Sequence, residues 1–556
     1  MHIDDQTYTV KGRTYRRVLL RKSYRQEGKV KVKTIANISH CTDEEIEALK
    51  IALKNKGNLK ALENITEAQC QYGKKVGAVA ALHQTADKLG IKKALGNNRE
   101  AKLVMWLVFA RILGQGSRLS AVRLAQNHAA CEIIGLDSFN EDDLYQSMNW
   151  LCQNQNRVEE KLFKFKRAKE ANDGNSSSSS FFLYDLTSSY LEGDLNELAD
   201  WGYNRDKKKG KKQIVCGLLT DGDGDPVAVE AYRGNTADSS TVGYQVDALL
   251  NRFGCQNVAF VGDKGSIKTS GIEAIQEAGF NYITSITKPQ IRRLLVRNII
   301  QMDLFDVKIC EVTDEEESVR YILRRNPERS KKMARSRDSK IDKIKQELAK
   351  SNKYLAEHPL SRVSTQLNNI LKRISKLKLD NIIQLKHDET SRTIVLFINT
   401  IALQEESSLD GCYILKTDLP CEAASCETVH QRYKDLALVE KAFRTFKTGH
   451  LEVRPVYLRN EERTRAHIFI TMLAYKLERF FRECWKNQNL TVQEGFERLS
   501  SITALLMTIG SGQVAKIAKP NKTCASLLDS AQITLPNSLP YKEVSVVTRK
   551  SLPESR

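Results

Sequence analysis

The segment that decides the fold is residues 181–187, FFLYDLT, an apolar run of β-strand type with one carboxylate, Asp185, near its middle. A second run of the same kind, NVAFVGD, covers residues 257–263 and ends on Asp263. Short apolar runs bounded by turn residues predict buried strands. A carboxylate in such a strand is costly to bury unless it is paired or binds a cation, so both aspartates are candidate site residues. A strand-end Asp that caps a turn is the alternative interpretation of either one alone.

Around these two strands the pattern predicts an α/β domain. Residues 213–220 and 226–232 read as a hairpin joined by the turn DGDGD. Two amphipathic helices, at 241–253 and 271–278, and a strand at 282–286 complete the segment. The order β-β-β-α-β-α-β is typical of a mixed sheet with helices on its faces.

Changes in composition divide the rest of the chain. The polar segment NDGNSSSSS at 172–180 predicts a linker. Residues 288–405 break the α/β rhythm and predict one or two long basic helices. Strand pattern returns at 410–417, followed by helices at 434–446 and 461–486. The expected parts are a basic β/α segment (1–72), a helical region with a linker (73–175), a core in two halves (181–287 and 406–517), an insertion between them (288–405) and a frayed tail (518–556).

The charge balance indicates a polyanionic partner. The chain of 556 residues carries 87 Lys or Arg and 68 Asp or Glu, a net charge of +19. Nucleic acid and an acidic membrane surface both fit this charge. The longest apolar helix candidate, 103–113, is shorter than the roughly 20 residues of a membrane span, and the N-terminus has no signal-peptide pattern. We therefore expect a soluble, intracellular protein. Its twelve cysteines have no zinc-finger spacing, so reduced thiols are expected rather than a zinc site.

A third carboxylate, Glu440, lies on a predicted helix. Tyr433, Glu440 and Lys447 are seven residues apart, so in one helix they would form a single stripe. Arg444 flanks Glu440 on one side, and the other side is an apolar stripe that should face the sheet: Leu436, Val439, Phe443 and Phe446. The alternative is an ordinary amphipathic helix with a solvated Glu and Lys.

Three carboxylates suit the chemistry of phosphodiester cleavage. That reaction needs neutralisation of the attacked phosphate and a nucleophilic oxygen, and two Mg²⁺ ions about 3.5 to 4 Å apart supply both. Mg²⁺ prefers carboxylate oxygens as ligands. Two strand carboxylates together with a helix carboxylate beside a basic helix face therefore favour a metal-dependent phosphoryl-transfer site.

Several ordered motifs resemble the DDE transposases of bacterial insertion sequences. They are YDLT (184–187), GYNRD (202–206), GNTAD (234–238), DKG (263–265), VEKAFR (439–444) and RPVY (454–457). The chain is most similar to a branch with a large insertion before the catalytic Glu and a Y-x2-R-x3-E-x6-K signature. Tyr433, Glu440 and Lys447 match that signature, but Leu436 stands in place of its Arg. Arg444 and Arg432 are the candidate substitutes for the missing cation.

The resemblance implies an RNase H-like, retroviral-integrase-like fold preceded by a mainly helical DNA-binding region. It implies that Asp185, Asp263 and Glu440 are catalytic metal ligands, with two Mg²⁺ ions that Mn²⁺ can replace. Tyr433 and Lys447 would contact DNA phosphates. The implied activity is cut-and-paste transposition, with cleavage at terminal inverted repeats and strand transfer into target DNA. A homodimer would carry it out in the bacterial or archaeal cytoplasm, at the nucleoid, and residues 1–170 would recognise the repeats.

A basic loop after the first strand of the sheet is a further candidate for DNA contact, because phosphate contacts are the main use of such clusters. A solvated surface loop is the alternative. The predicted DNA-binding residues of this loop are Arg205, Lys207, Lys208, Lys209, Lys211 and Lys212. Arg444, on the predicted helix, is a further predicted DNA-binding residue. Two other functions stay open: an RNase H-like nuclease that cuts without joining, and a catalytically inactive DNA-binding derivative of a transposase.

Overall fold

The computed structural model describes residues 1–10, 13–26, 29–54, 56, 69–173, 180–388, 391–448, 451–453, 457–509, 512–539 and 546. Most of the predicted linker and of the RPVY motif lies outside these residues. The chain divides into two compact units. The sheet unit comprises Ala86–Gln115 and Asp142–Phe480, and the terminal unit comprises Met1–Thr85, Gly116–Glu141 and Phe481–Arg556. Within the described residues, no helix has the length and apolar character needed to cross a bilayer.

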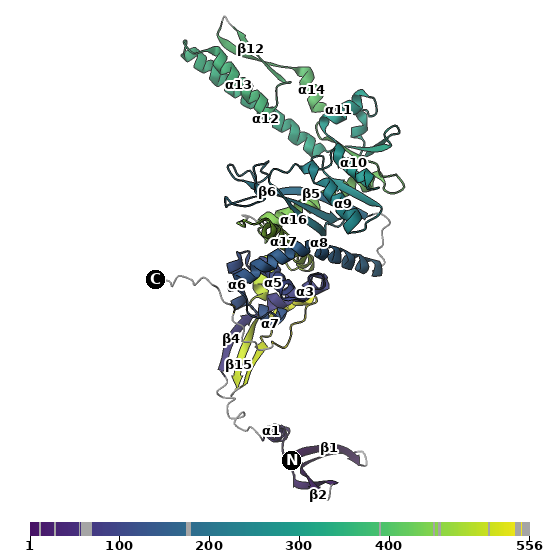
Figure 1. Cartoon of the computed structure of the whole chain (residues 1–556), viewed down its shortest axis with the longest axis vertical. Coiled ribbons are helices and arrows are strands. Elements are labelled where there is room, and N and C mark those ends of the chain that lie inside the picture. The colour runs from purple at the N-terminus through teal and green to yellow at the C-terminus, as the bar shows by residue number, and fades with distance from the viewer. Residues whose placement is uncertain are drawn as a thin grey trace. The chain divides into compact units, whose positions relative to one another are not determined.

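A mixed sheet, eight-stranded within the described residues, forms the core of the sheet unit (Figure 1). β5, β8 and β9 are parallel neighbours, and the other pairings are antiparallel. The predicted strands around Asp185 and Asp263 are confirmed as β5 and β8. In spatial order the strands are β10 (Cys310–Asp314), β11 (Val319–Arg325), β14 (Cys412–Thr417), β9 (Asn281–Ser285), β8 (Val258–Gly262), β5 (Ser180–Tyr190), β6 (Gln213–Asp221) and β7 (Pro226–Tyr232).

Helices cover the sheet and determine which way Asp185 points. Phe182, Tyr184 and Leu186 of β5 join a buried core with α9 (Val242–Asp247) and α10 (Thr269–Glu277). Since side chains alternate along a strand, Asp185 points to the opposite face. The helices α15 (Cys426–Lys434) and α16 (Leu436–Thr448) also pack on the sheet, α15 against β8 and β9 and α16 against β5 and β6.

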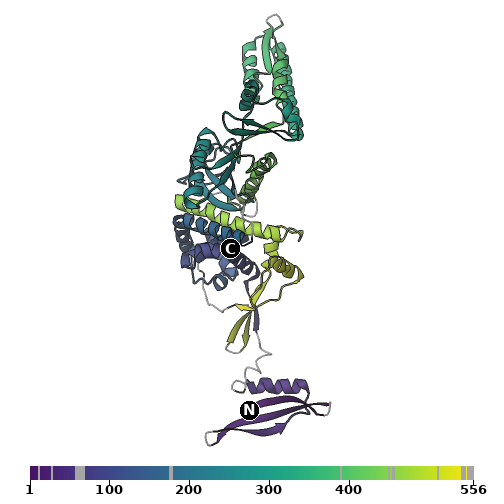
Figure 2. The same cartoon turned by 90° about the vertical axis from the view of Figure 1, so that its right-hand side faces the viewer.

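A helical module interrupts the sheet between β11 and β14, which we call the helical insertion. Its two long helices lie side by side next to a β-hairpin (Figures 1 and 2). A hydrophobic core of its own holds the module together, with Ile344 and Ile374 almost fully buried. The predicted long basic helices are therefore confirmed. The elements are α12 (Pro327–Glu357), α13 (Val363–Leu377), β12 (Ile383–Asp388), β13 (Thr393–Ile398) and α14 (Thr400–Ser408).

The limits of this module differ from the predicted insertion at 288–405. β10 and β11, which lie in the predicted insertion, extend the main sheet instead, because β11 pairs with β14 from Arg320–Thr417 to Arg325–Cys412. Before them, α11 (Lys288–Val296) follows β9 directly, and its Ile291 and Leu294 pack into the core around β11 and β14.

The described residues of the terminal unit form two small sheets. The N-terminal sheet is antiparallel, β1 (His2–Val10), β2 (Arg13–Gln26) and β3 (Lys29–Asn37), and α1 (Asp43–Lys54) packs against it (Figure 2). The second sheet has the order β17 (Ser538–Leu539), β16 (Gly512–Ile517), β15 (Thr503–Ile509) and β4 (Gln69–Lys75). Helices α18 (Val492–Leu499) and α19 (Lys522–Ser530) pack together. The expected frayed tail was therefore wrong over α19, where Leu527 is fully buried.

The helices expected in residues 73–175 are present. They are α3 (Gly77–Lys88), α4 (Ile91–Leu95), α5 (Arg99–Gly114), α6 (Arg118–Asn127), α7 (Ala130–Ile134) and α8 (Glu141–Asn172). They do not form one separate domain, because α5 and α8 belong to the sheet unit whereas α6 and α7 belong to the terminal unit. The DNA-binding role of this region stays a prediction.

Candidate active site

Two of the predicted carboxylates lie on neighbouring parallel strands. The register pairs Tyr184 of β5 with Gly262 of β8, so the next residue on each strand is Asp185 and Asp263 respectively. Asp263 follows the last residue of β8, and its Oδ1 accepts hydrogen bonds from the backbone N–H groups of Gly265 (3.0 Å) and Ser266 (2.8 Å). These bonds fix the side chain of Asp263 at the carboxyl end of the strand.

The pKa of Asp185 depends on the charges of the other two predicted carboxylates. Burial raises the pKa of Asp185 to about 7, and the negative charges of Asp263 and Glu440 add to the rise. The hydrogen bond from the Leu186 N–H (2.8 Å) and the positive charge of Arg205 oppose it. Burial is the larger cause, and the nearby negative charges make the ionised form of Asp185 still less favourable.

Glu440 lies on α16, which packs against β5. Its side chain is exposed. The helix that carries it begins two residues later than predicted, since α15 ends at Lys434 and α16 begins at Leu436 with a turn at Asp435. The prediction of one helical stripe through Tyr433, Glu440 and Lys447 is therefore wrong for Tyr433, which belongs to α15. Leu436 is half-buried at the first position of α16.

Tyr433 lies beside the two aspartates. Its hydroxyl donates to Ser285 Oγ at the end of β9 (2.8 Å). Burial raises the pKa of this hydroxyl, and the charges of Asp263 and Asp185 act in the same direction, while Arg329 acts against it. The phenol is thus held near the carboxylates by a strand neighbouring β8.

Lys447 forms an ion pair inside the protein. Its Nζ lies 3.0 Å from Asp206 Oδ1, and the two side chains are only 10% and 5% exposed. The other oxygen of Asp206 accepts from the Tyr190 N–H (3.3 Å) at the end of β5. The pair joins the last turn of α16 to the start of the basic loop.

The basic loop is held at both ends and exposed in its middle. Arg205 donates to Asp238 Oδ2 (2.6 Å), and its backbone N–H donates to Ser188 Oγ (3.0 Å). Lys211 pairs with Glu192 at 3.2 Å, and Lys212 is half-buried. The side chains that are exposed are Lys207, Lys208 and Lys209, of which Lys208 lies 5.7 Å from the Tyr190 ring centre.

The two candidate substitutes for the missing signature Arg are placed differently. Arg432 donates to the Gly222 carbonyl (3.3 Å) and to Asp435 Oδ2 (3.2 Å), and its guanidinium lies 5.2 Å from the centre of the Phe181 ring. It is therefore engaged by the β6–β7 turn and β5. Arg444 is exposed on α16, four residues beyond Glu440.

Comparison with protein families matches two parts of this chain. Residues 176–477, which contain the entire mixed sheet, match the model of the transposase DDE domain. Residues 6–66 match the N-terminal domain of IS1634 family transposases. The chain belongs to the DDE transposases. It is a DNA transposase of an insertion sequence, an enzyme that cleaves and transfers DNA strands. No curated protein sequence gives a significant match.

DDE transposases generally use divalent metal ions, and the donor set of this transposase suits one. Carboxylate oxygens are the ligands that hard divalent cations prefer. The charges of Asp263 and Glu440 contribute to the raised pKa of Asp185, and a bound cation would offset that contribution. Among the residues that the structure describes, no three His, Cys, Asp or Glu side chains lie together at metal-binding distance. Holding an ion among all three candidates therefore requires at least one of these side chains to move.

Three neighbours of the site were not singled out from the sequence of the transposase. Asp206 and Asp238, which pair with Lys447 and Arg205, both end motifs that resemble the family, so the signal for them was present. Arg329, whose charge acts on Tyr433, gave no such signal because it lies among many other basic residues at the start of α12.

Proposed function

We propose that Asp185, Asp263 and Glu440 hold two Mg²⁺ ions, replaceable by Mn²⁺, with which the transposase carries out cut-and-paste transposition. When bound, such ions neutralise charge on the attacked phosphate and activate the attacking oxygen. One observation carries the proposal. Two aspartates occupy adjacent positions on parallel strands, and the charge of a glutamate from a helix packed on the same strand reaches Asp185. An RNase H-like fold, with the carboxylates at the carboxyl end of β8, is consistent with this assignment.

The residues around the carboxylates would position DNA. The phenol of Tyr433 is oriented by Ser285 and is available beside the carboxylates to pack against the reacting strand. The pair between Lys447 and Asp206 anchors the basic loop to α16. In this proposal, Lys447 acts on DNA by holding that loop, and it contacts a phosphate itself only if the pair opens.

The exposed part of the basic loop would bind the DNA backbone. Lys207, Lys208 and Lys209 are exposed and follow Arg205, whose charge acts on Asp185. Each phosphate contact of this kind contributes about 0.9 to the slope of log affinity against log salt. Arg444, exposed one turn beyond Glu440, is a further candidate for contact with the strand that reacts.

Cleavage assays on carboxylate variants test this proposal. The substrate is a duplex that carries the inverted repeats found in the DNA flanking the gene. Asp185→Ala, Asp263→Ala and Glu440→Ala should each abolish cleavage in Mg²⁺ and leave binding in EDTA largely unchanged, because binding comes from the basic surface. Asp223→Ala is the matched control, since Asp223 is exposed in the β6–β7 turn. Cleavage by Asp263→Ala at the wild-type rate would rule out the assignment.

A joining assay separates transposition from plain cutting. Given a pre-cut element end with a free 3′ hydroxyl, the wild type should join it to target DNA. An enzyme that cleaves the ends but never joins them would be an RNase H-like nuclease, and one that binds without cutting would be an inactive derivative. We also propose that residues 1–170 recognise the repeats and that a homodimer acts in the synaptic complex. The match of residues 6–66 to a transposase N-terminal domain supports a role in end recognition.

A further inference from the structure

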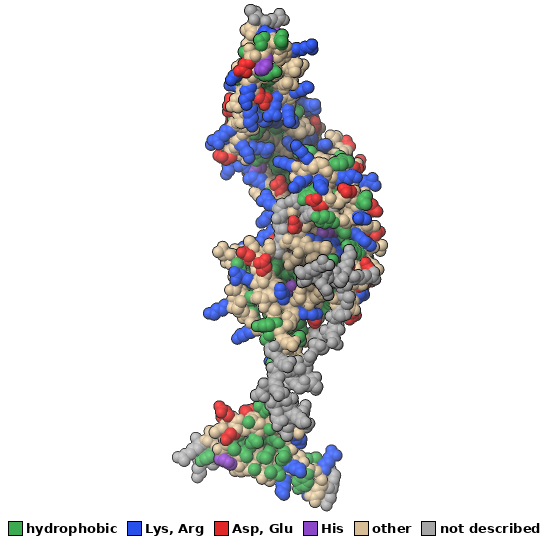
Figure 3. Space-filling view, turned by 90° about the vertical axis from the view of Figure 1, so that its left-hand side faces the viewer, with side chains coloured by type: hydrophobic (Ala, Val, Ile, Leu, Met, Phe, Trp, Pro, Cys, Tyr) green, Lys and Arg blue, Asp and Glu red, His purple; other side chains and the backbone are tan. Residues whose placement is uncertain are grey.

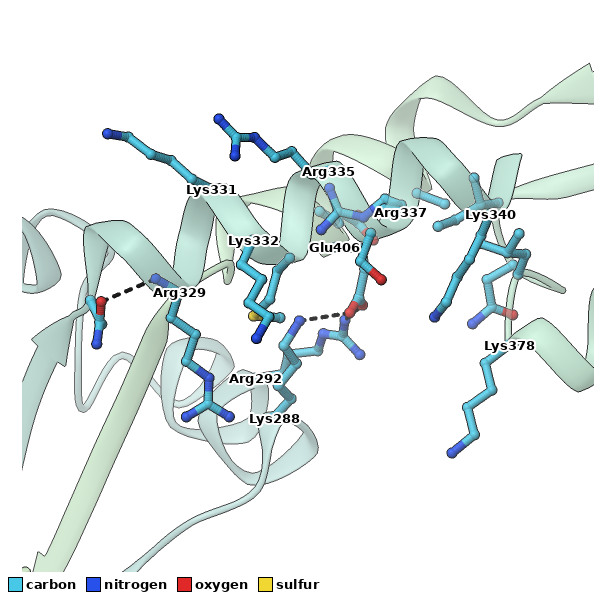
Figure 4. A pocket seen from close by; sticks show the side chains of 18 of the residues that line it. Lys288, Arg292, Arg329, Lys331, Lys332, Arg335, Arg337, Lys340, Lys378 and Glu406 are labelled. Carbon is cyan, nitrogen blue, oxygen red and sulfur yellow. Dashed lines mark hydrogen bonds and ion pairs between the residues drawn. The ribbon is translucent and has the colours of Figure 1, made fainter. Parts of the chain in front are cut away.

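A basic groove lies in the sheet unit outside the carboxylate site (Figure 4). Its volume is about 1320 Å³, and its walls come from α11, the first half of α12, the segment 378–382 that follows α13, and α14. Nine Lys or Arg residues and three Glu residues line it. A concave surface with such an excess of cations is suited to a polyanion rather than to an apolar ligand.

Much of the positive charge in the groove is not neutralised by the protein. Glu406 is paired with Lys288 (2.7 Å) and with Arg292, so this carboxylate is already matched by two cations. In the part of the chain that the structure describes, no ion pair is formed by four further lining residues: Arg329, Lys332, Lys340 and Lys378. These four cations can therefore bind an external anion without breaking an internal pair.

The cations of α12 project from two sides of the helix. Arg329, Lys332 and Lys340 extend from the side that faces Lys288 and Arg292 (Figure 4). This is expected, because Lys332 is three residues from Arg329 and Lys340 is about three helical turns from it. Lys331 and Arg335 extend from the opposite side of the same helix (Figure 4). Both of these residues nevertheless line the groove, whereas Lys343 and Lys350, further along α12, are exposed outside it.

The near end of the groove adjoins the carboxylate site. β9 and β11 are both antiparallel to β14, so they run in the same direction, and β9 is parallel to β8. The carboxyl ends of β8, β9 and β11 therefore share one edge of the sheet. Asp263 follows β8 at this edge, α11 follows β9, and α12 follows β11. Three strand spacings, about 14 Å, separate β8 from β11.

Arg329 links the two sites. It lies in the first turn of α12, which begins at this edge, and its positive charge partly offsets the rise in the pKa of Tyr433, the phenol held beside the carboxylates. From Arg329 to Lys340 the helix rises about 16 Å at 1.5 Å per residue. Since DNA has one phosphate per 3.4 Å along each strand, that length spans about five phosphates. Figure 3 shows Lys and Arg side chains gathered around a hollow in this part of the surface.

We propose that this groove binds the sugar-phosphate backbone of the element-end duplex during cleavage, and that Arg329 supplies there the cation that the signature loses at Leu436. The inference rests on the proposed function, because it needs DNA at the carboxylates. The element end is the occupant because cleavage precedes joining, and the groove starts at the edge where the cleaved strand would lie. A guanidinium can hold a phosphate with two parallel hydrogen bonds, which a lysine cannot do.

Salt-dependent binding measures the phosphate contacts. The full chain is titrated in EDTA, between 50 and 300 mM KCl, with a fluorescein-labelled 30-base-pair duplex of mixed sequence. Phosphate contacts carry no sequence information, so this probe suffices. Arg329→Gln/Lys332→Gln should lower the slope of log affinity against log salt by about 1.8, at about 0.9 per contact. Lys343→Gln/Lys350→Gln removes two exposed cations of the same helix that do not line the groove and should leave the slope close to that of the wild type.

The outcomes are decisive in either direction. An equal fall of the slope in both double variants would show that only general surface charge matters, and no fall in the groove variant would show that DNA does not lie there; either result overturns the inference. Unfolding midpoints of the two variants check that both are folded. Arg329→Lys should keep the slope but lower the rate of end cleavage about tenfold, whereas an unchanged rate would remove the role given to Arg329. Normal cleavage with reduced joining in the groove variant would assign the groove to target DNA instead.

A failure of this proposal can be distinguished from a failure of the proposed function. Binding in EDTA needs no catalysis, so a failure of the salt experiment leaves the carboxylate assignment intact. Conversely, a wild-type protein that binds with the expected slopes but never cleaves would contradict the proposed function and not the DNA groove.

Discussion

The ion pair between Lys447 and Asp206 leads to a specific prediction about the stability of the sheet unit. Both side chains are almost buried, 10% and 5% exposed, and their charged atoms are 3.0 Å apart. Removing one partner of a buried pair leaves the other charge uncompensated, which costs about 3 to 5 kcal/mol. Asp206→Asn should therefore lower the free energy of unfolding by that amount. At about 2 °C per kcal/mol for a large domain, the unfolding midpoint should fall by about 6 to 10 °C.

The double variant Asp206→Asn/Lys447→Met tests the cause. Because it removes both charges, it should be more stable than Asp206→Asn alone, and with Lys447→Met as the second single variant the double-mutant cycle gives the coupling energy of the pair. Scanning calorimetry and urea unfolding, followed by circular dichroism, measure both quantities. The control is Glu160→Gln on α8, whose partner Lys164 is 2.5 Å away but 68% exposed, so the loss should stay below about 1 kcal/mol. A cost of Asp206→Asn no larger than this control would refute the argument and leave Lys447 available to bind a phosphate directly.

Two further predictions concern the stability of the sheet unit. Burial, opposed by Arg252, raises the pKa of Glu159 from 4.5 to about 8, so between these pH values the folded state binds more protons than the unfolded state. The free energy of unfolding should therefore fall as pH rises, by up to about 1.4 kcal/mol per pH unit. Urea unfolding from pH 5 to 8 should show a flatter pH dependence for Glu159→Gln. Gly411 has a φ of 74° and an added Cβ would lie 2.5 Å from the Asn326 carbonyl, whereas Gly279 has a φ of 72° and open space. Gly279→Ala should thus cost about 1 to 2 kcal/mol and Gly411→Ala distinctly more, and equal unfolding midpoints for the two variants would contradict the steric argument.

The sequence predicted the elements that carry a strong local pattern. The strands around Asp185 and Asp263 are continuous apolar runs, and the long basic helices repeat with helical spacing, so both are present in the structure. The break at Asp435 could not be seen, because Leu436 continues the apolar spacing and Asp435 itself keeps helical backbone angles. Local pattern predicts an element well and its interruption poorly.

The long-range relations were harder to predict. β11 was assigned to the insertion because its pairing partner, β14, lies on the far side of the helical insertion in the sequence. The local sequence pattern of a strand does not identify a pairing partner so far away in the chain. In the same way Lys447 matched a family signature, but its burial against Asp206 depends on the loop after β5. Arg329 could be selected from its many basic neighbours only after the sheet edge was known.

The route by which the helical insertion leaves and rejoins the sheet has an evolutionary consequence. The chain departs after β11 and returns at β14, two strands that pair directly from Arg320–Thr417 to Arg325–Cys412, and the Asn326 N–H donates to the Gly411 carbonyl (2.9 Å) at the junction. The insertion thus occupies the place of a hairpin turn. Lengthening a loop at such a point costs little, about 0.6 kcal/mol for each doubling. This position can therefore accept modules of very different size and sequence while the carboxylates stay in register, and new DNA-holding surfaces can be acquired there without rebuilding the enzyme.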